Sequence, residues 1–358
     1  MRMEEICRPI RAELQKVDRE IQDRLDCDNE FIRRINEYIT GRPGKKIRPA
    51  LILFSAKMGG TVPNKAVLTA AAVEMVHTAA LIHDDVVDCS DKRRGQPTVR
   101  SKWKNGISVL LGDRWYSRAV AALSNSGMTE ILGMLLEVVD EMCAGELEHL
   151  RRCYDISLEE REYLEIIENK TASLMAFCCE AGALLGETSP GDRRALIDYG
   201  LNLGMAFQII DDCLDMAGTE KRMKKPLGND LREGRITLPL VHVMRTADER
   251  DRKWIRQCFQ SRRIDQETAG RVKKITRQCR AVEYALGKAV EYSDTAKAAL
   301  GLVRDGKSRR SLELLADYVL ERGLDGTETL AINDIGPLYE PTSWGLEPAT
   351  IGMEGNTL

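Results

Sequence analysis

Apolar residues recur at three- and four-residue steps along most of the chain, which is the period of an α-helix that buries one face. This pattern predicts an amphipathic helical segment from Met1 to about Thr40. Further helices are predicted over residues 50–57, 64–87, 107–123, 128–143, 158–185 and 195–214, and again between residues 238 and 320. No run of period-two alternation is long enough to specify a sheet. We therefore predict an all-α fold, with a single helical-bundle domain over residues 1–324.

The last part of the chain has a different composition. Residues 325–358 are rich in Gly, Pro, Thr and Asn and lack the helical period. Such a segment buries little apolar surface. We expect a flexible or lightly ordered tail.

Composition excludes some classes of function. The 358 residues carry a net charge of -3, contain 5% aromatic residues and have no long Lys/Arg tract, so nothing favours nucleic-acid binding. The N-terminal segment is charged and has no apolar signal-peptide core, and no window approaches the roughly eighteen uninterrupted apolar residues of a membrane span. The ten cysteines are scattered without a CxxC pair, which favours reduced thiols. We expect a cytoplasmic protein with no integral membrane segment.

Two acidic clusters share the spacing Asp-Asp-x-x-Asp, and each follows an apolar segment. They consist of Asp84, Asp85 and Asp88, and of Asp211, Asp212 and Asp215. On a helix, residues four apart lie one turn apart on the same face, so their carboxylates should converge. One such cluster could equally be a solvated helix end. Two apolar-flanked copies indicate a cavity, because buried carboxylates are costly unless they bind a metal or a cation, and oxygen-only ligands suit Mg²⁺.

Basic residues accompany both clusters. Lys45, Lys46 and Arg48 follow a Gly-Pro break and lead into a helix, which is typical of an anion site but also of a solvated basic turn. Lys170 interrupts an apolar run, where its ammonium either reaches solvent or faces the acidic cavity. Carboxylates, Mg²⁺ and basic side chains together would form a cage for a diphosphate, and apolar walls suit a hydrocarbon. The predicted ligand is an isoprenoid diphosphate, which the cage would ionise to an allylic carbocation.

These motifs resemble those of the trans-isoprenyl diphosphate synthases of the polyprenyl synthetase group, over roughly residues 43–322. Gly44-Lys45-Lys46-Ile47-Arg48-Pro49 is similar to the family's GGKRxRP element, with Pro43 in place of the first glycine. Residues 84–95 and 208–215 resemble its two aspartate-rich motifs. Residues 230–239 resemble its DLxEGKxTLP element, with Arg235 where the family usually has Lys.

The resemblance implies an isoprenoid-synthase bundle around a central cavity and a condensation of isopentenyl diphosphate with an allylic diphosphate, head to tail and trans. Several Mg²⁺ ions, which Mn²⁺ can replace, would be held by Asp84, Asp85, Asp88, Asp211, Asp212 and Asp215. Ionisation would depend on Asp84, Asp85, Asp88, Lys170, Asp211 and Lys225. The allylic diphosphate would be held by Arg93, Lys170, Thr171, Gln208 and Lys225, and isopentenyl diphosphate by Lys45, Arg48, His77 and Arg94. Arg235 would bind substrate, with a planar guanidinium that is larger than the ammonium group of the lysine usual at this position.

The resemblance also addresses product length. In the family, the growing tail passes the residues one helical turn before the first aspartate motif, here Ala79 and Ala80, preceded by Val76. Short-chain enzymes place aromatic side chains there. Two alanines favour an open tunnel and a long-chain product, although alanine also simply packs helices closely and another helix could supply a floor. A short-chain farnesyl or geranylgeranyl diphosphate synthase is the alternative.

Three more distant alternatives stay open. Glu74-Met75-Val76-His77 and Glu146-Leu147-Glu148-His149 are both Glu-x-x-His on predicted helices, as in di-iron carboxylate bundles. A terpene cyclase of the same fold would share the aspartates but would not need Lys45, Arg48 and Arg94. A subunit of a heteromeric synthase would need a partner, whereas the resemblance implies a homodimer.

Overall fold

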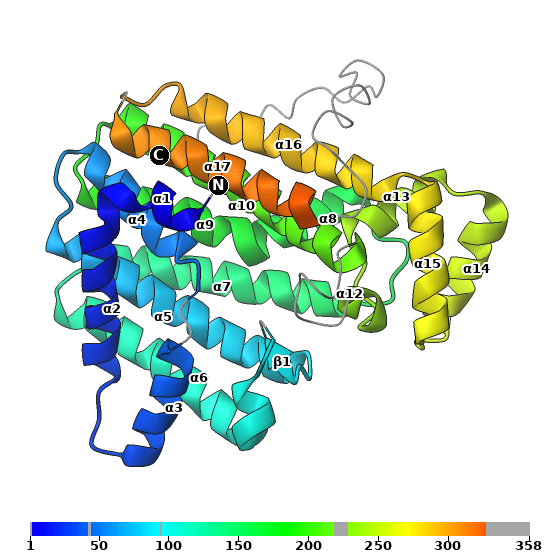
Figure 1. Ribbon diagram of the computed structural model, residues 1–358, viewed down its shortest axis with the longest axis horizontal. Coiled ribbons are helices and arrows are strands. Elements are labelled where there is room, and N and C mark those ends of the chain that lie inside the picture. The colour runs from blue at the N-terminus through cyan, green and yellow to red at the C-terminus, as the bar shows by residue number, and fades with distance from the viewer. Residues whose placement is uncertain (1, 42–43, 94, 218–227, 305, 327–358) are drawn as a thin grey trace, which may run out of the picture.

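The chain folds into a bundle of long helices, described by a computed structural model over residues 2–41, 44–93, 95–217, 228–304 and 306–326 (Figure 1). The N-terminal half contains α1 (Met3–Ile6), η1 (Arg8–Ile10), α2 (Arg11–Leu25), α3 (Glu30–Thr40), α4 (Ile47–Met58), α5 (Asn64–Val87), α6 (Val99–Asn125) and α7 (Thr129–Arg151). The rest contains α8 (Glu160–Ile167), η2 (Glu168–Ala172), α9 (Ser173–Leu185), α10 (Pro190–Ala217), α12 (Asn229–Arg232), α13 (Leu238–Thr246), α14 (Glu249–Gln260), α15 (Gln266–Gln278), α16 (Ala281–Leu300) and α17 (Lys307–Gly326).

The predicted all-α class is confirmed. In the described residues the only strands are β1 (Lys92–Arg93) and β2 (Gln96–Pro97), an antiparallel pair beyond α5 that the sequence pattern did not predict. The predicted helix 158–185 is divided by η2, a single turn of π-helix. The predicted helix 128–143 continues to Arg151, because its last two turns, although more polar, keep the helical conformation.

The core lies between the most apolar helices. α4, α5 and α9 pack against one another, and α10 packs between α9 and α16. Most of their side chains are buried, as expected for helices that are apolar on nearly all sides. By length and hydropathy α5 is the one described helix that could span a membrane, but 61% of its apolar window is buried inside the protein, so it is explained as a core helix.

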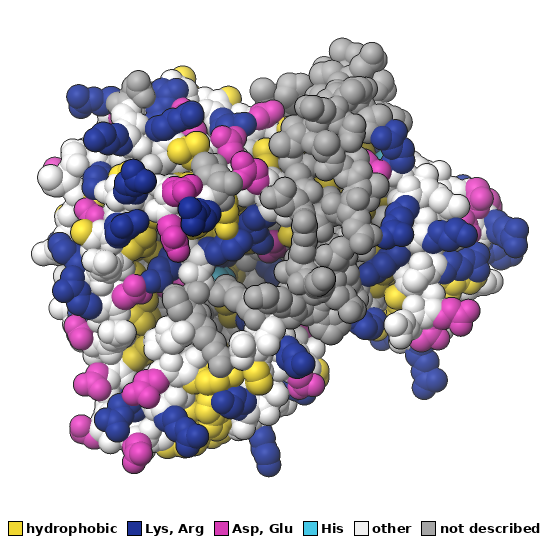
Figure 2. All heavy atoms as spheres, viewed as in Figure 1, with side chains coloured by type: hydrophobic (Ala, Val, Ile, Leu, Met, Phe, Trp, Pro, Cys, Tyr) yellow, Lys and Arg dark blue, Asp and Glu magenta, His cyan; other side chains and the backbone are white. Residues whose placement is uncertain are grey.

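The helices that carry the motifs have their C-terminal ends close to one another. Figure 1 shows the C-terminal ends of α5, α7 and α10 at the same end of the bundle, beside α12. Helices α13, α14 and α15 form a lobe beyond that end, and its visible surface carries many Lys and Arg side chains (Figure 2). α17 is described as a helix to Gly326, whereas the predicted tail lies almost entirely outside the described residues.

Candidate active site

The first aspartate cluster lies where α5 ends. Asp84 and Asp85 belong to its last turn, and Asp88 is the residue that caps it. Burial raises the pKa of Asp84 to about 6, although Lys170 and Arg93 nearby favour its charged form. Partial burial of the carboxyl group disfavours its charged form.

Two of the three carboxylates of this cluster pair with cations. Arg93 Nε donates to Asp85 Oδ1 at 2.8 Å, and Arg235 forms an ion pair with Asp88. Within the part of the chain that the structure describes, no three His, Cys, Asp or Glu side chains lie close enough to hold a metal by themselves. Asp85 and Asp88 therefore have different cationic partners, and Asp88 is the residue that caps α5.

The second cluster, near the end of α10, is tied to a chain of hydrogen bonds. Thr171 donates to Gln208 Oε1 at 2.8 Å, and Gln208 Nε2 donates to Asp212 Oδ1 at 2.8 Å. Tyr163, on α8, donates to Asp212 Oδ2 at 2.7 Å. Burial raises the pKa of Asp212 to about 6, against the effect of these two donors. Tyr163 was not predicted from the sequence, since no local motif distinguishes it from other buried tyrosines.

Asp215 has a different environment from the rest of its cluster. It is only 3% exposed, and its Oδ2 accepts the backbone N–H of Asp230 at 3.1 Å. Its backbone carbonyl accepts the N–H of Gly228 at 3.1 Å. Asp215 therefore connects the end of α10 to the segment that leads to Arg235.

Lys170 and Thr171 are presented by the π-helical turn η2. An extra residue in a helical turn bulges the backbone and redirects side chains, which is common at functional sites. Lys170 forms an ion pair with Glu146 of α7, and its Nζ lies 3.5 Å from His149 Nδ1. The Lys170 ammonium therefore points toward Glu146 and lies near Asp84 of the first aspartate cluster.

Arg235 is 6% exposed and surrounded by acceptors. It pairs with Asp88, its Nε donates to Glu233 at 2.9 Å, and its Nη1 lies 3.5 Å from Glu146 Oε1. Burial acts to lower the pKa of Arg235, but Asp88, Glu146 and Asp230 outweigh it and raise that pKa. The guanidinium thus joins the end of α5 to α7.

The backbone before Arg235 is fixed by Tyr154. The Tyr154 N–H donates to the Gly234 carbonyl at 2.7 Å, and its hydroxyl donates to the Arg232 carbonyl at 3.2 Å. Gly234 has φ +75°, and a Cβ there would lie 2.5 Å from the Tyr154 ring. Only glycine satisfies both conditions without strain, which explains the Glu-Gly-Arg sequence.

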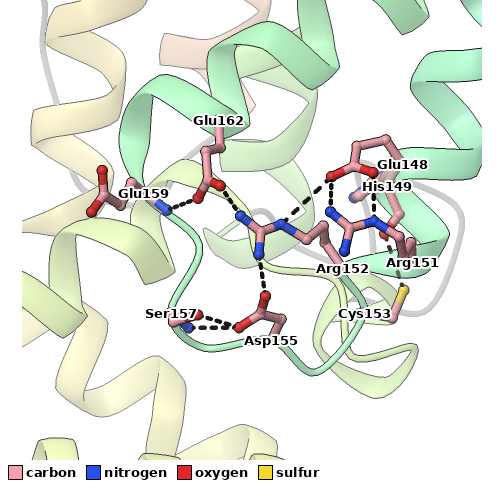
Figure 3. Close-up of polar contacts among 9 residues, drawn as sticks. All are labelled: Glu148, His149, Arg151, Arg152, Cys153, Asp155, Ser157, Glu159 and Glu162. Atoms are coloured by element: carbon pink, nitrogen blue, oxygen red, sulfur yellow. Dashed lines mark hydrogen bonds and ion pairs between the residues drawn. The ribbon is translucent and has the colours of Figure 1, made fainter.

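A network of charged residues holds the turn that carries Tyr154. Arg152 pairs with Asp155, Glu162 and, more distantly, Glu148, while the Glu159 N–H donates to Glu162 (Figure 3). Cys153 Sγ donates to the His149 carbonyl at 3.6 Å. The C-terminal end of α7 is therefore anchored to the start of α8.

The residues predicted for isopentenyl diphosphate lie at the start of α4 and on α5. Arg48 Nη1 lies 3.1 Å from His77 Nε2, so these two are brought together. Burial lowers the pKa of Arg48, and Glu74 and Asp211 act in the opposite direction. Lys45 Nζ lies 5.1 Å from the Tyr318 ring of α17, and Lys46 pairs with Asp18. Two predicted residues, Arg94 and Lys225, lie outside the described residues.

Arg322 of α17 was not predicted and lies at the second cluster. Its Nη2 donates to Asp211 Oδ1 at 2.8 Å, and its guanidinium lies 4.8 Å from the Phe207 ring. The contact links residues 111 positions apart. Sequence spacing carries no signal for such a pair.

The donor set fits a hard divalent ion. Asp84, Asp88 and Asp211 offer carboxylate oxygens, and the nearby His149 turns its Nδ1 to two cations instead. Mg²⁺ commonly takes one or two protein carboxylates and completes its shell with water and phosphate oxygens. Separate carboxylates opposite a group of cations suit that mode.

The candidate chain-length residues are on the core side of α5. Val76 and Ala79 are buried, and Ala80 is half-buried. Ala80 lies one turn before Asp84 on the same helical face. The α5 residues that lead from the aspartates toward the core are therefore small and apolar.

An all-α bundle with two aspartate clusters and ion-paired Lys and Arg side chains at one end is the arrangement expected of a helical enzyme that binds a diphosphate. The polyprenyl synthetase family profile matches residues 29–278. The chain is 36% identical over 327 residues to a short chain isoprenyl diphosphate synthase of Methanothermobacter thermautotrophicus, covering 89% of this chain and 99% of that protein. It is 34% identical over 322 residues to the octaprenyl diphosphate synthase of Escherichia coli, covering 90% and 99%.

A solved structure agrees with these sequence relationships. The polyprenyl synthase from Caulobacter crescentus, complexed with calcium and isoprenyl diphosphate, superposes with a TM-score of 0.85 at 35% identity, covering 89% of this chain and 97% of that chain. This protein belongs to the polyprenyl synthetase family. Membership confirms the recognised resemblance and the expected enzyme class, a prenyltransferase. Membership of this family argues against the alternative of a di-iron carboxylate bundle.

Proposed function

We propose that this protein condenses isopentenyl diphosphate with an allylic diphosphate, with the help of Mg²⁺, to make a long-chain polyprenyl diphosphate. The observation that carries the proposal is a continuous set of ion pairs that joins α5, α7, η2 and the segment before α13. Its members are Asp88, Arg235, Glu146 and Lys170. Thr171, Gln208 and Asp212 continue the polar surface onto α10.

The basic and polar residues of this surface and the aspartates beside it have different roles. Lys170, Thr171, Gln208 and Arg235 hold the allylic diphosphate, together with Arg93 and Lys225. Asp84, Asp88 and Asp211 would hold Mg²⁺, with Asp85, Asp212 and Asp215 orienting their neighbours. The bound ions supply positive charge that stabilises the departing diphosphate.

Isopentenyl diphosphate binds to a second set of basic residues, around Arg48 and His77. Arg48 and His77 are already in contact at 3.1 Å, which fixes the guanidinium before the substrate arrives. Lys45 and Arg94 complete that subsite in the proposal. The need for a second diphosphate subsite is what separates this proposal from a terpene cyclase.

The test is to incubate the purified protein with Mg²⁺, labelled isopentenyl diphosphate and, separately, geranyl, farnesyl and geranylgeranyl diphosphate, and to size the dephosphorylated products. Products longer than geranylgeraniol support the long-chain proposal. Products that stop at farnesol or geranylgeraniol support the short-chain alternative, which the name of the Methanothermobacter relative favours. No incorporation by this protein alone would favour the heteromeric subunit or the cyclase.

We further propose a cytoplasmic homodimer. Large apolar side chains are exposed on α6 and α7, including Leu110 at 68% and Leu147 at 67%. Figure 2 shows hydrophobic side chains gathered over the region of α3 and α6. Exposed apolar patches often mark protein–protein interfaces, and all ten cysteines are free thiols, as in a reducing compartment. Sedimentation of the protein and of Leu110→Lys and Leu147→Lys variants tests the dimer.

A further inference from the structure

The second Glu-x-x-His motif contributes Glu146 to the ion pairs described above, but neither Glu146 nor His149 has yet been given a task in substrate binding. Glu146 and His149 are three residues apart on α7 and so share a face. That face meets two cations from distant parts of the chain. Glu146 pairs with Lys170 and lies 3.5 Å from Arg235 Nη1, and His149 Nδ1 lies 3.5 Å from Lys170 Nζ and 3.2 Å from Arg235 Nη1.

The chemistry of these partners fixes the state of His149. An ammonium and a guanidinium carry donors and no acceptor, so the Nδ1 atom between them is an unprotonated acceptor. The ring proton is then on Nε2. Burial, with Lys170 and Arg235 beside it, lowers the pKa of His149 to about 2, which agrees with a ring that stays neutral.

A neutral acceptor at this position can orient the cations without offsetting their charge. The other acceptors around Arg235 are carboxylates, namely Asp88, Glu146 and Glu233, which offset positive charge. His149 orients both cations without adding negative charge, so it does not weaken their attraction for an anion. Lys170 and Arg235 repel each other when they are held close together. Glu146 contacts both of them, and its negative charge offsets that repulsion.

We propose that Glu146 and His149 are positioning residues that hold Lys170 and Arg235 as one two-cation unit for the allylic diphosphate. The inference rests on the proposed function. Long basic side chains lose rotamer entropy when they bind a ligand, and fixing them beforehand removes much of that cost. Because α7 carries both acceptors, its approach to η2 sets the distance between the two cations.

The experiment compares three variants of the full chain. His149→Leu removes the acceptor, and His149→Asn retains an amide oxygen near the position of Nδ1. His242→Leu is the matched control, because His242 stacks on Tyr284 at 4.1 Å in a contact unrelated to Lys170 or Arg235. Thermal unfolding of each variant confirms that it is folded.

The readout is calorimetric binding of a non-ionisable allylic thiolodiphosphate with Mg²⁺, and of isopentenyl diphosphate. We expect His149→Leu to weaken binding of the allylic analogue about tenfold or more, or about 1.4 kcal/mol. Binding of isopentenyl diphosphate should change less than about twofold, and His149→Asn should recover most of the loss. Unaltered binding in His149→Leu, equal loss in both His149 variants, or equal loss for both substrates would overturn the inference.

A second readout reports the tautomer. The chain has four histidines, so ¹⁵N-histidine spectra are simple, and the signal lost in His149→Asn should show an unprotonated Nδ1 that does not titrate between about pH 5.5 and 8. A protonated Nδ1 there would contradict the proposal. If the wild-type protein fails to elongate any starter while the binding and tautomer results hold, the proposed function fails and the positioning role stands. If elongation is normal and the binding and tautomer results fail, the proposed function stands and the positioning role is wrong.

Discussion

Gly145 of α7 lies directly against the backbone nitrogen of Lys170. A Cβ at residue 145 would come within 2.8 Å of that nitrogen and 3.0 Å of the Asn169 Cβ. Both neighbours belong to η2 and cannot move without shifting the turn that presents Lys170. The close approach of these two backbones therefore determines where η2 presents Lys170 relative to α7.

We expect Gly145→Ala to lower kcat/KM for the allylic substrate by about tenfold to a hundredfold, because a displacement on the order of 1 Å at a positioned group has that effect. Overpacking should also destabilise the fold by about 1–3 kcal/mol. Steady-state kinetics and denaturant unfolding measure the two.

Gly133 provides the matched control on the same helix. Nothing lies within 4 Å of a Cβ built there, so Gly133→Ala should leave activity unchanged and stabilise the protein by up to about 1 kcal/mol. Equal kinetic effects from the two substitutions would show that the gap between α7 and η2 does not matter.

Arg322 forms an ion pair with Asp211, whose carboxylate we assign to Mg²⁺. Its Nη2 donates to Asp211 Oδ1 at 2.8 Å, so a metal must share or displace this contact. We expect Arg322→Gln to lower the Mg²⁺ concentration for half-maximal activity by about twofold to fivefold, since a partly exposed ion pair is worth up to about 1 kcal/mol. Titration of activity with Mg²⁺ measures the change. A higher Mg²⁺ requirement in the variant would mean that Arg322 supports the metal rather than competing with it.

The raised pKa of Asp84 makes stability depend on pH. Its pKa of about 6 lies above the ordinary value of 3.8 because burial disfavours the charged form. Between these values the folded state binds more protons than the unfolded state, so the free energy of unfolding falls as pH rises toward and through 6. The cost of this buried charge is thus absent well below pH 4 and complete above pH 6.

Asp84→Asn removes that cost. We therefore expect the metal-free variant to be more stable than wild type by about 1–3 kcal/mol at about pH 7.5, and the difference to shrink as the pH falls toward 4. Urea unfolding in a chelator at several pH values is the measurement. A difference that stayed constant with pH would show that Asp84 does not titrate in this range.

The sequence predicted the helices well where the apolar period was strong. Residues 64–87 were predicted as one helix, and α5 has those bounds. The π-turn at Lys170 was missed because one inserted residue leaves the local apolar pattern almost unchanged. The motif residues Arg48 and His77 were predicted together and do lie in contact, since motif resemblance carries three-dimensional information that periodicity lacks.

Other parts of the site depend on contacts between distant segments. Glu146 and His149 were noticed as a metal motif, but the cations beside His149, Lys170 and Arg235, stand 21 and 86 positions further along the chain. Tyr163 and Arg322 carry no motif at all. Helical spacing placed Asp84, Asp85 and Asp88 at the end of one helix, but it carried no information about the ion pair between Asp88 and the distant Arg235.

The tunnel below the first aspartate cluster determines product length in our proposal. Ala80 lies one helical turn before Asp84 on the same face, and Ala79 is 2% exposed within the core. A phenyl ring at either position should block a growing tail, so we expect Ala79→Phe and Ala80→Phe to shorten the product. Ala79→Phe must also displace packed neighbours, at a cost of about 1–3 kcal/mol.

Ala80→Phe is therefore the cleaner test, and Ala80→Val gives an intermediate increase in volume. Product length should decrease from wild type to Ala80→Val to Ala80→Phe. Sizing the dephosphorylated alcohols measures this. The first condensation with a short starter should stay within about threefold of wild type, because the floor meets only longer tails. An unchanged length distribution in both phenylalanine variants would place the tunnel along another helix and leave Val76, Ala79 and Ala80 as packing residues of α5.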